Sequence, residues 1–336
     1  MIPVVLAATA SAQSLRFAAI GDFGDDDDDS RAVAALVRGW DPELIVTVGD
    51  NDYSDGAYQG SNEGLELGVG QYYADWIGDY SGAYGAGATE NAFWPTPGDH
   101  DWGDTCDDPG GLDDYLAYFD LPDGPGEGRY YDFRRGPVHF FALHSVEDCE
   151  PDGATADSAQ ARWVRDAAAA SDAPFKVAFF HHPPWSSGEY ATDGEHMQWP
   201  WADWGFQLVL AGHEHDYERV WTEGITSLVI GLGGVDIRGF ECPVAGSQVR
   251  FDDDYGALLV EATDTELDVS FHTVGGVEVD RFTIAVDGSP SNTREGVEAE
   301  ECARGCGCRN APVGGLFGVL ALAGLGGLAV FRRSAA

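Results

Sequence analysis

The chain has 336 residues, enough for one large or two modest hydrophobic cores, and its aromatic content of 12% argues against a disordered polypeptide. Asp and Glu number 58 against 18 Lys and Arg, so the formal net charge is −40. A surface with this charge repels nucleic acid and anionic membranes, which argues against a polyanion-binding function and predicts no nucleic-acid partner.

The first twelve residues predict a truncated signal peptide. Met1–Ala8 is a short apolar run, and Ala10-Ser11-Ala12 has the pattern of small residues that precedes a secretory cleavage site. Because no basic segment precedes this run, an ordinary first strand is the alternative interpretation.

Two apolar strands separated by a helix are predicted at the start of the domain. The strands are Leu15–Ile20 and Leu44–Val48, and the helix covers Arg31–Arg38, with Ser30 as its candidate N-cap. The acidic run Asp25–Asp29 before the helix is interpreted as a solvated loop, with a Ca²⁺-binding loop as the alternative. The spacing of strand, helix and strand predicts a parallel βαβ unit.

The next part of the chain is less regular. Ser54–Ala92 is rich in Gly, Tyr and Trp and predicts an insertion that carries a helix around Tyr72–Ile77. The two prolines in Phe93–Pro97 argue against a central strand there. Further along, Arg129–Phe133 and Val138–Leu143 predict a β-hairpin.

The second half alternates helix and strand and then changes to strands alone. An apparent capping box at Asp157–Gln160 opens a helix predicted to end near Ala170, and the strands Val177–Phe180 and Phe206–Ala211 follow. Four later strands predict a second, largely antiparallel sheet: Ser227–Leu232, Ala257–Ala262, Glu266–His272 and Val277–Ile284. These elements place the fold in the α/β class, as an α+β sandwich with two sheets, in one domain over residues 13–287.

The end of the chain predicts export. Residues 288–311 form a polar linker with a Cys motif, and within residues 312–336 an uncharged span of bilayer length is followed by Arg332-Arg333. The positive-inside rule places the preceding domain outside the cell. The arrangement resembles the MYXO-CTERM sorting tails of surface proteins, and a plain single-pass anchor is the alternative. Either interpretation predicts a cell-surface, outer-membrane-associated or secreted protein whose membrane contact is made by the tail.

Cysteine usage agrees with an oxidising compartment. Among the six cysteines, Cys106 and Cys149 both lie in acidic loops and are expected to pair first. Cys242 and the three cysteines near the end of the chain are not assigned.

Short polar motifs follow most of these strands. They are Gly21-Asp22-Phe23-Gly24, Gly49-Asp50-Asn51-Asp52-Tyr53, Gly98-Asp99-His100-Asp101, His181-His182-Pro183-Pro184-Trp185 and Gly212-His213-Glu214-His215. Because ligands gather at the carboxyl ends of strands in open α/β sheets, these residues are expected to meet. On extended backbone His213 and His215 face the same side and reach two metal ions roughly 3.5–4 Å apart. Carboxylates and imidazoles without thiolates suit Fe, Mn or Zn.

The order of these motifs resembles that of the calcineurin-like metallophosphoesterases over roughly residues 15–285, and Tyr53 together with GHEHDYER resembles the purple acid phosphatase branch. The resemblance implies a four-layer architecture, in which helices flank two packed mixed β-sheets, and it implies two metal ions. It places one ion on Asp22, Asp50, Tyr53 and His215 and the other on Asp50, Asp99, His181 and His213, with Asp50 as the bridge. A phenolate from Tyr53 favours Fe(III), with Fe(II), Zn(II) or Mn(II) as the second ion.

The resemblance further implies an acid-phosphatase-like hydrolysis of small phosphomonoesters. Two cations would lower the pKa of a bound water, giving hydroxide, and would hold the phosphate oxygens for in-line attack. His100 is the candidate catalytic residue that contacts the phosphate and protonates the leaving alcohol. A phosphodiesterase on the same site and an inactive metal-binding surface protein are the alternatives, and the sequence does not determine the oligomeric state.

Two positions depart from the family pattern. Asp99 stands where Asn is usual, and an extra carboxylate there would still bind a metal but weaken the binding of anions. Tyr190 stands where the mammalian-type phosphatases carry a histidine, and His196 is the candidate substitute, so both are candidate substrate-binding residues. His182 is interpreted as a supporting or packing residue.

Overall fold

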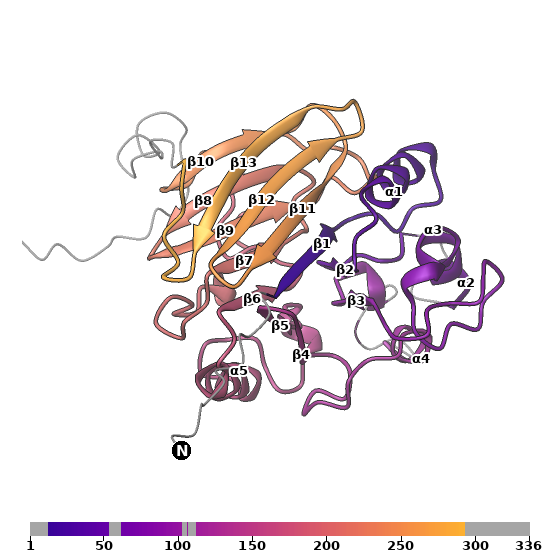
Figure 1. Cartoon of the computed structure of the whole chain (residues 1–336), viewed down its shortest axis with the longest axis horizontal. Helices are drawn as coiled ribbons and strands as arrows, with labels where there is room; N and C mark the ends of the chain where they lie inside the picture. The colour runs from indigo at the N-terminus through magenta and orange to yellow at the C-terminus, as the bar shows by residue number, and fades with distance from the viewer. Residues whose placement is uncertain (1–12, 54–61, 103–105, 107–111, 293–336) are drawn as a thin grey trace, which may run out of the picture.

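The computed structural model describes residues 13–53, 62–102, 106 and 112–292, and these form two β-sheets packed face to face (Figure 1). One sheet has the strand order β13-β12-β11-β1-β2-β3, with bounds Glu278–Ala285, Glu266–Thr273, Gly256–Thr263, Ser14–Ile20, Leu44–Thr47 and Phe93–Pro95. The other has the order β10-β8-β9-β7-β6-β5-β4, with bounds Ser247–Phe251, Tyr217–Thr222, Ile225–Ile230, Leu208–Ala211, Phe175–Phe179, Val138–Ala142 and Tyr131–Arg135. Both sheets contain parallel and antiparallel pairs, so the predicted pair of mixed sheets is confirmed.

The side chains of β1 show how the layers are built. Phe17 and Ala19 point into the core between the two sheets, while Ala18 and Ile20 point into a second core on the opposite face. A strand that is buried on both faces reads as a continuous apolar run rather than as an alternating one, and β1 does so over Phe17–Ile20.

Helices cover the outer face of each sheet. The core outside the first sheet includes side chains of α1 (Asp28–Trp40), α3 (Gln71–Tyr73) and α4 (Asp113–Tyr118), and α2 (Asn62–Leu65) adds Leu65 to it. The core outside the second sheet includes Ala161, Val164 and Ala168 of α5 (Ala159–Ala170). In Figure 1, α1 to α4 lie together on one side, and α5 lies apart from them. The result is four layers: helices, sheet, sheet and helix.

Two helix starts differ from the prediction. The N-cap of α1 is Asp27, whose carboxylate accepts the backbone N–H groups of Asp29 and Ser30, so the acidic run enters the helix and Ser30 is not the cap. Carboxylates at a helix N-terminus are stabilised by the helix dipole. The N-cap of α5 is Ser158, and Gln160 bonds to the backbone of His144 instead of closing a capping box.

The membership of the later strands also differs. β9 lies in the second sheet, parallel to β7, whereas β11, β12 and β13 extend the first sheet next to β1. They do not form one separate antiparallel sheet. Strand pairing depends on hydrogen bonds between distant segments, which a local pattern does not encode.

The predicted βαβ unit is confirmed, because β1 and β2 pair in parallel on either side of α1. β3 pairs with β2 at the edge of the sheet, where a strand ending in Pro95 is tolerated. Among the described residues, no helix is both long and apolar enough to cross a bilayer. The predicted signal peptide, the Cys motif and the C-terminal span lie outside these residues.

The predicted disulfide is present. Cys106 and Cys149 are bonded, with Cα atoms 5.2 Å apart across a sequence separation of 43. The bridge connects the segment that follows the Gly98–Asp101 motif to the loop between β5 and α5.

Candidate metal centre

The polar motifs meet at one end of the two sheets. Asp22 follows β1, Asp50 follows β2 and Asp99 follows β3 in the first sheet, while His181 follows β6 and His213 follows β7 in the second. β1, β2 and β3 run parallel to one another, as do β6 and β7, so the carboxyl ends of the strands in each sheet lie together. The expectation that strand ends bring these residues together is confirmed.

Three of these side chains are positioned by backbone in a conformation that is rare for residues other than glycine. Asp22, Asp50 and His213 have φ values of 56°, 52° and 69°, in the left-handed region. Such conformations cost energy in residues other than glycine and concentrate at functional sites. The expectation of extended backbone at His213 is wrong, because the chain bends after β7 and His213 and His215 reach the site by that bend.

Two glycines of the motifs allow the side chains of His181 and Asp50 to pack closely against the backbone. Gly49 has a φ of 96°, and a Cβ there would lie 2.6 Å from Nδ1 of His181. A Cβ on Gly98 would lie 2.1 Å from Oδ1 of Asp50. Both distances are far below van der Waals contact, so a side chain at either position would displace His181 or Asp50.

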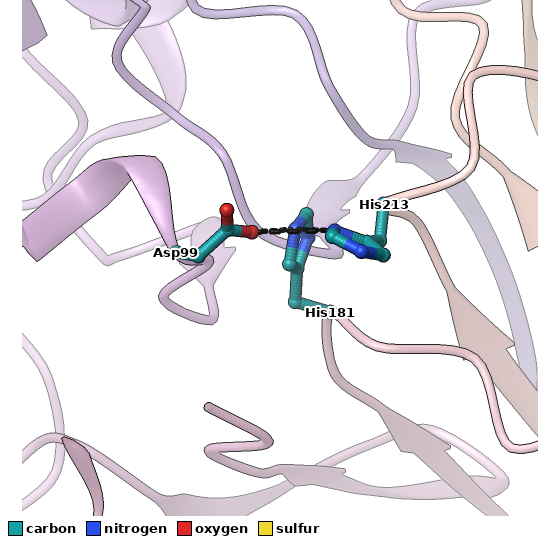
Figure 2. Close-up of side chains that lie close together, drawn as sticks. All are labelled: Asp99, His181 and His213. Carbon is teal, nitrogen blue, oxygen red and sulfur yellow. Dashed lines mark hydrogen bonds and ion pairs between the residues drawn. The ribbon is translucent and has the colours of Figure 1, made fainter. Parts of the chain in front are cut away.

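One group of side chains is centred on the carboxylate of Asp99 (Figure 2). Its Oδ1 atom lies 2.7 Å from Nε2 of His181 and 3.3 Å from Nδ1 of His213. The two imidazole nitrogens are 3.2 Å apart. Nδ1 of His181 lies 3.0 Å from the carbonyl of Val48, which can only accept, so that nitrogen carries hydrogen and Nε2 faces the cluster.

A second group is centred on the hydroxyl of Tyr53. This oxygen lies 2.5 Å from Oδ2 of Asp50, 3.2 Å from Oδ1 of Asp22 and 3.2 Å from Nε2 of His215. Nδ1 of His215 lies 2.7 Å from the carbonyl of Asp236, so Nε2 is again the nitrogen that faces the site.

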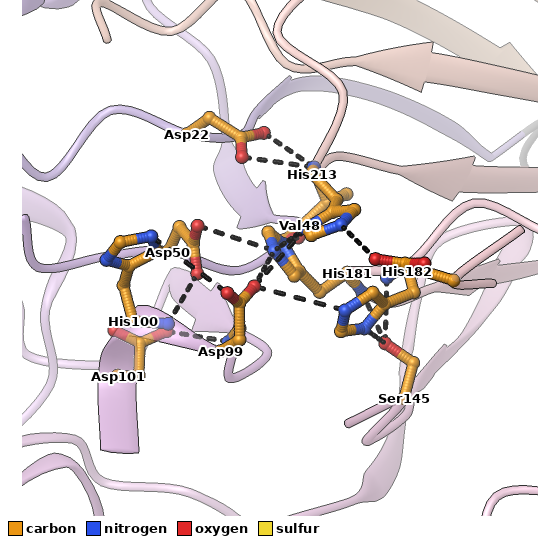
Figure 3. Close-up of polar contacts among 12 residues, drawn as sticks. Asp22, Val48, Asp50, Asp99, His100, Asp101, Ser145, His181, His182 and His213 are labelled. Carbon is orange, nitrogen blue, oxygen red and sulfur yellow. Dashed lines mark hydrogen bonds and ion pairs between the residues drawn. The ribbon is translucent and has the colours of Figure 1, made fainter. Parts of the chain in front are cut away.

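The carboxylate of Asp50 belongs to both groups, and Figure 3 shows its contacts with His181 and with the backbone of His100. Its Oδ2 atom contacts Tyr53 and also lies 3.4 Å from Nε2 of His181. Its Oδ1 atom accepts the backbone N–H of His100 at 3.0 Å. Asp50 therefore lies between the two groups, as a bridging ligand must.

The electrostatics of the cluster favour added positive charge. Burial raises the pKa of Asp22, and burial and the neighbouring Asp50 raise that of Tyr53 well above its usual range. Burial tends to lower the pKa of His181, but Asp50 and Asp99 outweigh it and raise that pKa well above the usual value. The carboxylates thus hold protons on neighbouring groups, and a cation would supply the same compensation.

A sequence profile described as calcineurin-like phosphoesterase matches residues 15–217. This chain belongs to the calcineurin-like phosphoesterase family. The identity of the family was implied by the order of the motifs, and the match confirms it.

One protein is similar to part of this chain in sequence. An uncharacterized protein of Mycobacterium tuberculosis, matched in strains CDC 1551 / Oshkosh and H37Rv, is 28% identical over 166 residues, which is 44% of this chain and 30% of the relative. The chain therefore spans less than a third of that relative's length.

Two solved structures share the architecture. The purple acid phosphatase PPD1 from yellow lupin seeds has a TM-score of 0.62 at 18% identity, covering 84% of this chain and 57% of that chain. GAP50, the anchor in the inner membrane complex of Plasmodium, has a TM-score of 0.59 at 16% identity, covering 91% of this chain and 100% of that chain. At these identities the likeness shows the fold alone.

Members of the family bind two metal ions, and the donor set of this chain fits them. Three overlapping groups each have donor atoms within 4.8 Å of one another: Asp99, His181 and His213; Asp22, Asp50 and His181; Asp50, Asp99 and His100. Asp22, Asp50 and His181 are buried, and several carboxylates this close in a buried place are costly without a cation. Which ions bind, and through which of these atoms, stays a prediction.

The predicted substrate-contacting residues occupy different positions. His100 is half-exposed, its ring lies 4.4 Å from that of Tyr53, and its Nε2 lies 3.9 Å from Asp99. Tyr190 is exposed at the rim, with its ring 5.6 Å from that of His213. His196 is turned toward the protein, since its Nε2 lies 2.8 Å from the carbonyl of Ser145.

Other residues near the site were not found from the sequence. Arg238 donates its backbone N–H to the carbonyl of His215 at 3.0 Å and its guanidinium to the carbonyl of His213 at 3.1 Å. The same guanidinium lies 4.9 Å over the ring of Tyr190. Arg238 is in an irregular loop after β9, and no motif marks it. Asp193, whose Oδ2 lies 3.5 Å from Nε2 of His213, likewise follows no recognisable pattern.

Proposed function

We propose that this chain is a binuclear-metal phosphatase that hydrolyses small phosphomonoesters. The observation that carries the proposal is the carboxylate of Asp50, whose Oδ2 atom faces both Tyr53 and His181. A carboxylate shared between two neighbouring ligand groups suits a two-metal hydrolase, in which the two cations lie about 3.5–4 Å apart. The motif order, the family and the fold support the same proposal.

The residues of the chain would divide into two ligand sets. Asp22, Tyr53 and His215 would hold one ion, Asp99, His181 and His213 would hold the other, and Asp50 would bridge them. When bound, the ions would supply a nucleophilic water at mild pH and neutralise the phosphate oxygens. The phenol of Tyr53 supports Fe(III) in the first set, with Fe(II), Zn(II) or Mn(II) in the second.

The half-exposed imidazole of His100 is placed to contact substrate. Its backbone N–H is fixed by Asp50, while its side chain lies beside Asp99 and the ring of Tyr53. From there it would bind a phosphate oxygen and donate a proton to the leaving alcohol. Lys and Arg are not needed in this position, because the cations carry the countercharge.

The test is hydrolysis by the metal-loaded protein. We expect turnover of p-nitrophenyl phosphate with a higher kcat/KM than of bis(p-nitrophenyl) phosphate. The opposite order would make the protein a phosphodiesterase. Metal-loaded protein without turnover of either compound would support a metal-binding surface protein and overturn the proposal.

We also propose that the protein is exported and held at the cell surface. The Cys106–Cys149 disulfide supports an oxidising compartment, since such bonds are rare in the cytosol. Fractionation of the producing cells, followed by thiol labelling, tests this. Protein confined to the cytosol, with both cysteines reduced, would contradict it.

A further inference from the structure

The imidazole of His182 lies against the metal centre. It follows the ligand candidate His181 at the end of β6, and only 8% of the residue is exposed. Its ring lies 4.3 Å from that of His213 and 5.0 Å from that of His181. The sequence suggested a supporting or packing role, and these contacts show that packing is at least part of it.

Hydrogen bonds around Ser145 determine which nitrogen of His182 carries hydrogen. The hydroxyl oxygen of Ser145 accepts the backbone N–H of His181 at 3.1 Å and that of His182 at 2.8 Å. A hydroxyl oxygen has two acceptor positions and one hydrogen to donate. With both acceptor positions taken, Ser145 donates to Nδ1 of His182, which lies 3.3 Å away. The ring hydrogen of a neutral His182 is therefore on Nε2.

This Nε2–H is directed toward the centre. Figure 3 shows the ring of His182 between Ser145 and Asp99, with Nε2 on the Asp99 side. The distance from Nε2 to Oδ1 of Asp99 is 4.0 Å, beyond hydrogen-bond length. The same Oδ1 atom contacts His181 and His213, so the N–H is directed at the carboxylate that the candidate ligands share.

The other candidates for this role are less well placed. Nε2 of His196 is occupied by the carbonyl of Ser145. The ring of Tyr190 is covered on one face by the guanidinium of Arg238. Among the described residues, His182 has the imidazole that both packs on a candidate ligand and presents a fixed N–H to the centre.

We propose that His182 is a catalytic residue that donates its Nε2–H to a phosphoryl oxygen of the substrate. The inference rests on the proposed function and deepens it, because it adds a neutral hydrogen-bond donor opposite His100. It also accounts for Tyr190 at the position where a histidine was expected, since the donor comes from a different place in the chain.

Two substitutions separate donation from packing. His182→Gln keeps an N–H near the position of Nε2 but loses the ring, whereas His182→Phe keeps the ring and loses the N–H. A hydrogen bond to a charged oxygen corresponds to roughly a 10- to 100-fold effect on rate. We expect His182→Phe to lower kcat/KM for p-nitrophenyl phosphate by about this factor, and His182→Gln to lose less than tenfold. The proposal would be overturned if both variants lost kcat/KM equally, if neither lost it, or if His182→Gln lost more than His182→Phe.

Controls separate this role from metal binding and from general damage. Both variants should keep the metal content and the thermal stability of the wild type, and a loss of metal that parallels the loss of activity would overturn the proposal. His272→Gln is the matched control, because His272 lies on β12 of the other sheet and contacts Ser270 at 2.9 Å. It should leave kcat/KM unchanged.

Phosphate binding provides a measurement that does not depend on turnover. Titration calorimetry of the metal-loaded proteins with inorganic phosphate should show the same order of affinity: wild type, His182→Gln, His182→Phe. If the wild type binds phosphate but hydrolyses no phosphoester, the proposed function fails while these affinities still decide the role of His182. A wild type that binds no phosphate overturns both.

The tautomer gives a third, independent test. Side-chain ¹⁵N spectra of the wild type should show His182 protonated at Nε2, and Ser145→Ala should weaken that preference and lower kcat/KM severalfold. A wild-type His182 protonated at Nδ1 would overturn the proposal.

Discussion

The carboxylate of Asp99 lies 2.7 Å from Nε2 of His181, the shortest contact between the carboxylates and imidazoles of the metal centre. Burial tends to raise the pKa of Asp99, but its hydrogen bonds with His181 and His213 outweigh burial and hold that pKa below its usual range. Asp99 is therefore a negative charge at the place where the anionic substrate of the proposed reaction would approach.

Asp99→Asn should improve the binding of anions. Removing one charge a few Å from the phosphate is expected to lower KM for p-nitrophenyl phosphate and Kd for inorganic phosphate by about three- to tenfold. Steady-state kinetics and calorimetry measure this, with the exposed Asp172→Asn as the control. Weaker phosphate binding at unchanged metal content would contradict the prediction.

Tyr53→Phe tests the phenol as a metal ligand. The hydroxyl contacts Asp50, Asp22 and His215, so its loss should remove a donor from that group. If Fe(III) is bound there, the wild type absorbs visible light through charge transfer and the variant does not. Metal analysis should show less metal in the variant, and the exposed Tyr84→Phe should keep both metal and colour. Colour that survives in Tyr53→Phe would exclude this ligand.

Arg238 holds the backbone of both His213 and His215, so Arg238→Gln should disturb the centre without unfolding the protein. Loss of the guanidinium removes its charge-assisted bond to the carbonyl of His213, whose left-handed backbone is costly. We expect kcat/KM to fall by roughly tenfold, with a smaller fall in Arg238→Lys. The control is Arg281→Gln, because Arg281 forms an exposed ion pair with Asp268. This variant should leave kcat/KM unchanged.

The disulfide should stabilise the fold. Closing a loop with a sequence separation of 43 corresponds to at most about 4 kcal/mol of stability in the chain-entropy description. The Cys106→Ser/Cys149→Ser double variant should therefore unfold at lower urea concentration, by about 2–4 kcal/mol in the free energy of unfolding. Cys242→Ser is the control. Equal unfolding curves for the double variant and the wild type would contradict the prediction.

His144 should make stability depend on pH. Burial lowers the pKa of this imidazole to about 3, and its Nε2 accepts the indole N–H of Trp102 at 3.0 Å, a bond that protonation would break. The unfolded chain binds this proton below about pH 6.5 and the folded chain does not, so stability falls as the pH drops through that window.

The His144→Gln variant measures this contribution, because glutamine accepts the same bond and does not titrate. Between pH 7 and pH 5 the wild type should lose about 2 kcal/mol more than the variant in urea unfolding. Equal losses of stability in the wild type and the variant would show that His144 does not take up a proton on unfolding in this range.

The sequence by itself determined where the strands of the centre end and which polar residues come directly after them. Apolar runs such as Phe17–Ile20 specify a strand buried on both faces, and the residues after parallel strands must gather at one end of the sheet. That is why the meeting of Asp22, Asp50, His181 and His213 could be predicted without a structure. Local chemistry also indicated the hairpin of β4 and β5 and the Cys106–Cys149 pair.

Only the tertiary structure decided the features that depend on distant partners. Three such features rest on contacts between segments far apart in the chain. They are the sheet to which β9 belongs, the bend that turns His213 into the site, and the hydrogen bond from Arg238 to the carbonyl of His213. The tautomer of His182 depends on Ser145, which lies 37 residues away. Hydrogen bonds of this kind leave no periodic pattern in a sequence, because each partner contributes a single polar residue within an otherwise unremarkable loop.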